Sequence, residues 1–169
     1  MPKSGKRALI LTLLLTLLLG LSPAWAWERI EYLKDVEYQV FELTNEVRQE
    51  HHLMPLMQDF TLIDIARAHS DDMLERQYFS HVSPDGQSFK DRVVPAYSRS
   101  LARAGENIWG GHGYDYSDSN LIARVIVDSW MASPGHRANI LNPNFNYLGV
   151  GVSVMGKEIR ATQNFIQRR

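Results

Sequence analysis

The chain has 169 residues, of which 44% are hydrophobic, with 18 Lys and Arg against 19 Asp and Glu and no cysteine. This length predicts one domain, and the charge balance disfavours nucleic-acid binding, which needs a basic surface to neutralise phosphates. The lack of cysteine excludes disulfides, thiol nucleophiles and a lipid-modified N-terminal cysteine.

Residues 1–26 have the pattern of a secretory signal peptide. A positively charged start and an apolar, leucine-rich run at 8–21 precede the small-residue motif Ala24-Trp25-Ala26. An uncleaved membrane anchor is the alternative, but the run is shorter than the roughly 18–20 residues that a spanning helix needs. We therefore expect cleavage before Trp27, no stable membrane span afterwards, and a secreted or periplasmic protein.

Two amphipathic helices are predicted in the first half of the chain, after a lead-in at 27–34. Apolar residues recur at helical spacing over 35–50 and again over 61–77. His69 lies on the apolar stripe of the second helix. It is interpreted either as a hydrogen-bonded core histidine or as a wall of a functional cleft.

The middle of the chain is predicted to be irregular before helices return. Proline and glycine punctuate 79–105, and the glycine-rich stretch 110–113 predicts a flexible segment with an exposed His112, an auxiliary metal-ligand candidate. Apolar spacing predicts a third helix over 120–132. Ser133 and the proline after it then predict the start of a short fourth helix. Three residues at helical spacing are assigned to the core, namely Met57, Met73 and Trp130.

The C-terminal part changes to strand periodicity. Residues 147–154 and 158–166 alternate as a β-hairpin, and Gly149 and Gly151 leave one face bare for close approach of another backbone. A hairpin alone is marginally stable, so a further strand is expected near 105–109. Helices first, a hairpin last and no βαβ alternation predict an α+β fold.

Three short segments carry polar residues with no evident structural purpose. They are "FSHVSPDG" with His81, "AGENIWGG" with Glu106, and "SPGHRANIL" with His136. A turn needs the Pro, Asp and Gly that follow His81 for backbone reasons, but it does not need the histidine.

Together with "LTNEVRQEHHLMPL", "ARAHSDDMLERQYFSHVSPDG", "SWMASPGHRANILNPNFNYLGVGV" and "TQNF", these segments resemble the CAP superfamily, also called the SCP domain, over 35–169. The resemblance implies an α-β-α sandwich with a small antiparallel sheet between helical layers. It also implies a cleft that holds two histidines and acidic residues. His81, His136 and Glu106 match that pattern, with Asn107 beside the glutamate. The position of the second family acid is occupied by Ser133.

The chemistry of this set suits a metal site. Neutral imidazoles of His81 and His136 are candidate Zn²⁺ ligands, and Glu106 is a candidate second-sphere acceptor that orients one ring. Two protein ligands predict weak, exchangeable binding. The alternative is a structural network of the two histidines and the glutamate. Related proteins of the family bind divalent metal there, which supports the first interpretation.

Three functions are consistent with the sequence. The first is an exported binding protein whose cleft takes a small ligand, lipid, peptide or cell-wall component, with or without zinc. The second is a metal-assisted hydrolase acting on peptide or cell-wall substrates. The third is a surface protein whose outer faces bind partners. No complete catalytic constellation is evident, and no segment resembles the strained elbow that a serine nucleophile needs, so binding is favoured over catalysis.

Overall fold

The computed structural model describes residues 24–114 and 118–169, so residues 1–23 of the predicted signal peptide lie outside it. The chain divides into two units, Met1–Tyr32 and Leu33–Arg169. The described part of the first unit is the start of helix α2 (Ala24–Glu50). Within the described residues, no helix is both long enough and apolar enough to cross a membrane. The rest of this section concerns the second unit.

A four-stranded sheet forms the middle of this unit. Its strands are β1 (Met57–Gln58), β2 (Leu101–His112), β3 (Tyr147–Met155) and β4 (Glu158–Arg168), in the spatial order β1-β3-β4-β2. The predicted hairpin is β3 and β4, joined at Gly156, and the predicted third strand is β2, which pairs antiparallel with β4. The two-residue β1 pairs parallel with β3, so the sheet is antiparallel except at this edge.

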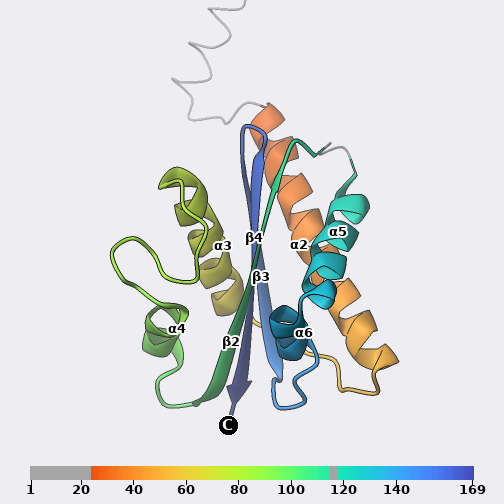
Figure 1. The fold of residues 1–169 in the computed structure, drawn as a ribbon, viewed down its shortest axis with the longest axis vertical. Helices are drawn as coiled ribbons and strands as arrows, with labels where there is room; N and C mark the ends of the chain where they lie inside the picture. The colour runs from red at the N-terminus through yellow and green to blue at the C-terminus, as the bar shows by residue number, and fades with distance from the viewer. Residues whose placement is uncertain (1–23, 115–117) are drawn as a thin grey trace, which may run out of the picture. The chain divides into compact units, whose positions relative to one another are not determined.

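Helices cover both faces of the sheet, as expected for an α-β-α sandwich (Figure 1). On one face lie α3 (Phe60–Glu75) and α4 (Phe89–Tyr97). On the other lie α5 (Ser119–Ala132), α6 (Pro134–Ile140) and the α2 residues that belong to this unit. The buried indole of Trp130 in α5 donates to the carbonyl of Ile108 in β2, which fixes this helix to the sheet.

Helix α3 packs directly on the backbone of β3. A Cβ atom added to Gly149 or Gly151 would lie less than 3.0 Å from backbone atoms of α3 at Leu62 and Ala66. Both α3 residues are fully buried. Helix α3 therefore packs on the strand face that the two glycines were predicted to leave bare. In addition, the hydroxyl of Ser70 in α3 donates to the carbonyl of Gly151 at 3.0 Å.

The prediction of an irregular 79–105 segment was wrong over α4 and the start of β2. Ser88 and Asp91 form a reciprocal capping box that starts α4, a local signal that outweighs Pro95 inside the helix. The predicted flexible stretch at 110–113 was also wrong in part, because Gly110, Gly111 and His112 pair with β4. Ladder hydrogen bonds hold these residues regardless of their side chains.

Two of the three residues assigned to the core are buried. Met73 and Trp130 are at most 1% exposed, whereas Met57 is 53% exposed. Met57 lies on the two-residue strand β1 at the edge of the sheet, and both residues of this strand are exposed. Helical spacing does not apply to a residue in that position.

Replacing Gly151 by Ala tests the close approach of α3. The added methyl must displace helix backbone, and overpacking of this kind costs about 1–3 kcal/mol or more of unfolding free energy. Gly135→Ala is the matched control, because its Cβ meets no atom within 4 Å. Urea denaturation measures both variants, and equal stability of the two would contradict the packing described.

Candidate functional site

The candidate site is centred on Glu106, a buried carboxylate in the middle of β2. Its side chain is 2% exposed. Arg92 of α4 donates from Nη2 to both carboxylate oxygens, at 3.0 and 2.8 Å, and is itself only 9% exposed. A buried carboxylate requires such pairing, because an isolated buried charge costs several kcal/mol. Arg92 therefore fixes the carboxylate of Glu106 in place.

His81 is oriented by this carboxylate. Its Nδ1 lies 2.9 Å from Oε1 of Glu106, and an ionised carboxylate can only accept, so Nδ1 carries the proton. In the neutral ring, the lone pair is then on Nε2. The His81 side chain is 49% exposed, and no residue that the structure describes hydrogen-bonds to Nε2. Arg92 also donates to the backbone carbonyl of His81 at 3.3 Å, so one guanidinium positions both residues.

Asn107, the next residue of β2, points to the opposite face of the sheet. Its amide nitrogen donates to the backbone carbonyl of His136 at 3.2 Å and to Gln163 of β4 at 3.0 Å. Asn139 of α6 donates to the side chain of Asn107 and to the carbonyl of Glu106. Because Asn107 is fully buried, these bonds fix the start of α6 against β2. Asn107 is thus a support for His136.

His136 lies at the start of α6, in the helical layer opposite that of α4 (Figure 1). Partial burial lowers the pKa of His136, and electrostatic repulsion from His81 lowers it further. His81 belongs to the α3–α4 loop and His136 to α6. His81 contacts Glu106 of β2, and the backbone of His136 contacts Asn107 of the same strand, so both histidines lie beside this edge strand of the sheet.

His69 is a buried support for the loop that carries His81. It is 2% exposed, and its Nε2 lies 3.1 Å from the carbonyl of Ser80. Since a carbonyl only accepts, Nε2 carries the proton. Burial lowers the pKa of His69 most strongly. Of the two interpretations of this residue, the structure matches the hydrogen-bonded core histidine.

The other two predicted residues are less closely connected to Glu106. Ser133 is the N-cap residue of α6, but its side chain makes no capping hydrogen bond, contrary to the usual behaviour of serine there. His112 is 66% exposed at the end of β2 and pairs with Glu158 at 2.6 Å. Within the described ranges, no three His, Cys, Asp or Glu residues are grouped so as to hold a metal ion.

Arg92 is the residue of the site that sequence reasoning missed. No role was assigned to it from the sequence. The signal was the capping box at Ser88 and Asp91, which predicts a helix. That helix places Arg92 in its first turns, facing the strand that carries Glu106.

The chain matches known proteins over most of its length. Residues 41–165 match the family model described as CAP, the cysteine-rich secretory protein family. The chain is 39% identical over 142 residues to an uncharacterized membrane protein of Bacillus subtilis (strain 168), YlbC, covering 84% of this chain and 37% of the relative. It is 43% identical over 130 residues to the uncharacterized protein YkwD of the same organism, covering 77% and 46%. The chain thus spans less than half the length of these relatives.

Solved structures show the same fold. An extracellular protein containing an SCP domain from Bacillus anthracis str. Ames is 40% identical, with a TM-score of 0.63 over 78% of this chain and 40% of its own. Another structure, of a protein crystallised with Zn²⁺, is 13% identical, with a TM-score of 0.57 over 78% of each chain. At that identity the second likeness supports the fold alone.

Replacing Arg92 by Met tests the buried ion pair. Loss of the guanidinium leaves the charge of Glu106 unpaired, and we expect a loss of about 3–5 kcal/mol of unfolding free energy. The double variant Arg92→Met with Glu106→Gln should recover part of this loss. Arg103→Met, at an exposed arginine that contacts Gln167, is the control. Denaturation curves in which the double variant is no more stable than Arg92→Met would contradict the pairing.

The lowered pKa of His69 predicts a stability that depends on pH. The unfolded histidine binds a proton more readily, so unfolding free energy should fall as pH drops below about 6.5, toward the folded pKa. His69→Gln keeps a donor for the Ser80 carbonyl but does not titrate, and it should reduce this dependence. Urea unfolding at pH 7.5 and 5.5 measures the change in unfolding free energy between the two pH values. An equal change in His69→Gln and the wild type would argue against a buried neutral ring.

Proposed function

Because the chain belongs to the CAP, or cysteine-rich secretory protein, family, we propose that it is an exported binding protein. Its site of His81, Glu106 and His136 would hold a small ligand together with an exchangeable divalent cation, Zn²⁺ being the first candidate. Export is supported by the signal-peptide pattern of residues 1–26 and by the extracellular relative from Bacillus anthracis. The carrying observation is the 2.9 Å contact between Nδ1 of His81 and Oε1 of Glu106, from which we infer a proton on Nδ1 and a lone pair on Nε2 that points away from Glu106.

The donor set fits a weakly bound cation. A metal-binding imidazole usually donates a hydrogen bond from its Nδ1–H to a carboxylate in the second coordination sphere, and His81 and Glu106 have this arrangement. His136 supplies a second ring that its lowered pKa keeps neutral and able to bind. A protein of the same fold was crystallised with Zn²⁺, so zinc is the first cation to test. A bound cation would supply positive charge for an anionic or carbonyl-bearing ligand.

The role of Glu106 follows from its contacts. Both of its oxygens accept from Arg92, and one also accepts from His81. It is therefore a positioning group, because neither oxygen is free to face a ligand. The ligand would instead meet the half-exposed His81 ring and the partly exposed His136 ring. Small ligands, peptides, lipids and cell-wall fragments that carry a metal-binding oxygen all meet this requirement.

Hydrolysis of peptide or cell-wall material is the second candidate. An imidazole held by a carboxylate through Nδ1 has the orientation of a general base. Proton transfer would then belong to Nε2 of His81, since Glu106 is occupied by Arg92. Turnover of a peptide or peptidoglycan substrate that is lost in His81→Ala would favour this candidate over binding alone.

Zinc titration by calorimetry tests the proposal. We expect binding to the wild-type protein at pH 7.5 and its loss in both His81→Ala and His136→Ala. His112→Ala is the control, because this exposed histidine pairs with Glu158 outside the site and its removal should leave binding unchanged. Equal heats for wild type and the double variant of His81 and His136 would end the metal proposal.

Proton competition gives a second measurement of the same site. Metal binds the neutral rings, so zinc affinity should fall on acidification. Because burial and His81 lower the pKa of His136, its competition with protons should begin below the ordinary histidine value of about 6.5. A zinc affinity that stays constant between pH 8 and pH 5 would contradict coordination by imidazole.

A further inference from the structure

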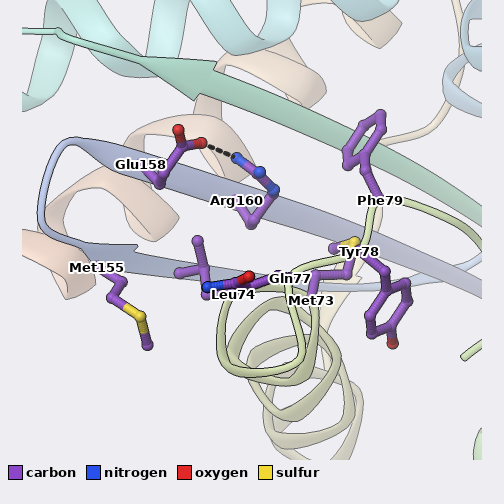
Figure 2. A pocket seen from close by; sticks show the side chains of 8 residues that line it. All are labelled: Met73, Leu74, Gln77, Tyr78, Phe79, Met155, Glu158 and Arg160. Atoms are coloured by element: carbon purple, nitrogen blue, oxygen red, sulfur yellow. Dashed lines mark hydrogen bonds and ion pairs between the residues drawn. The ribbon is translucent and has the colours of Figure 1, made fainter. Parts of the chain in front are cut away.

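A pocket of about 410 Å³ lies apart from the candidate site, between the end of α3 and the β3–β4 hairpin. Figure 2 shows Arg160 and Glu158 on β4 opposite the last residues of α3. Its apolar part comes from Met73, Leu74 and Phe79, together with Met155 of the hairpin. This volume is within the roughly 300–1,000 Å³ typical of small-ligand sites. The pocket therefore combines apolar surface with one guanidinium.

The guanidinium of Arg160 is held on one side and unpaired on the other. Its Nη1 donates to Glu158 and to the carbonyl of Ile159, both at 2.9 Å. Its Nε is buried and has no hydrogen-bond partner, and no hydrogen bond from Nη2 is formed among the described residues. Nε and Nη2 form the edge of arginine that binds a carboxylate with two parallel hydrogen bonds. A buried donor without a partner costs free energy that a ligand can recover.

Two neighbours of Arg160 define what that edge can accept. The ring of Phe79 lies 5.6 Å from the guanidinium carbon but is itself 53% exposed, so it can move aside for an incoming group. Glu158 is held by His112 at 2.6 Å as well as by Arg160, and its pKa is lowered chiefly by the hydrogen bond from His112. Because Glu158 already shares the positive charge of Arg160, the pocket disfavours phosphate-like polyanions.

Gln77 adds a polar group at the rim of the pocket. It follows the C-cap residue of α3 in a left-handed conformation, with φ of 53°, and is exposed. Its carboxamide makes no hydrogen bond within the described residues. A carboxamide offers one donor and one acceptor, which is the complement of a peptide unit. A simple fatty acid has no group to use it.

We propose that this pocket binds the C-terminal end of a peptide whose last residue is apolar. The terminal carboxylate would pair with the Nε–Nη2 edge of Arg160. The last side chain would pack against Phe79 and Met155, and the preceding peptide unit would bond Gln77. This inference is independent of the proposed metal and ligand site, because none of these residues belongs to that site.

Calorimetry with N-acetyl-Ala-Leu tests the proposal on the full chain. We expect the free acid to bind, and its C-terminal amide and inorganic phosphate to bind at least roughly tenfold more weakly, as expected for loss of a charge-assisted pair. Arg160→Lys keeps the charge and the side-chain stem but removes the fork, and it should weaken binding by a similar factor. Arg103→Lys, the exposed arginine at the far end of the β2–β4 ladder, should bind as wild type.

Two further variants complete the experiment. Gln77→Asn retains a residue suited to the left-handed conformation and shortens the amide, so binding should weaken even if Arg160→Lys misfolds. The double variant His81→Ala with His136→Ala should bind the peptide normally while losing zinc, which separates this proposal from the previous one. Equal binding of acid and amide, or no binding by wild type, would overturn it. Decanoate binding in place of the peptide would overturn the assignment to a peptide terminus.

Discussion

The alternation of one strand, β2, organises the whole candidate site. Successive residues of a strand point to opposite faces, so Glu106 and Asn107 are directed into different helical layers. Glu106 meets Arg92 of α4 and the loop histidine His81, whereas Asn107 meets α6 and Gln163. Both side chains are buried, so neither can rotate away without losing its hydrogen bonds. Two adjacent residues thereby hold the ring of His81 and the backbone of His136, which are 55 positions apart in the sequence.

The network that starts at Asn107 continues through the sheet. Gln163 of β4 donates to Thr44 of α2, and the hydroxyl of Thr44 donates to the carbonyl of Val40 in the same helix. All of the side chains in this chain of bonds are fully buried. A buried polar network whose members are all satisfied specifies one arrangement of helix and sheet, because any shift leaves a polar group unpaired. The position of His136 is therefore tied to the core as well as to its own short helix.

The sequence predicted the layers better than it predicted the contacts of the site. Hydrophobic periodicity located α3, α5 and the hairpin, because burial on one face is a local pattern. The bare glycines of β3 even indicated where another backbone would approach, which is α3. The motifs identified His81, Glu106 and His136, but nothing local says that Arg92 reaches Glu106. That contact depends on how α4 packs against β2, a tertiary property, and α4 itself was overlooked because Pro95 was taken as a loop signal.

Glu37 occupies part of the strand edge of β3 that β1 leaves unpaired. Strand β1 pairs with only the first two residues of β3, which leaves the outer backbone of the rest of β3 open. Glu37 of α2 accepts the backbone N–H of Val152 at 3.0 Å and an ion pair from Arg67 of α3 at 2.5 Å. A charged group placed on a strand edge prevents an additional strand from aligning there. The bridge between two helices thus also guards against self-association by strand addition, a hazard for any protein that must remain dispersed at high local concentration.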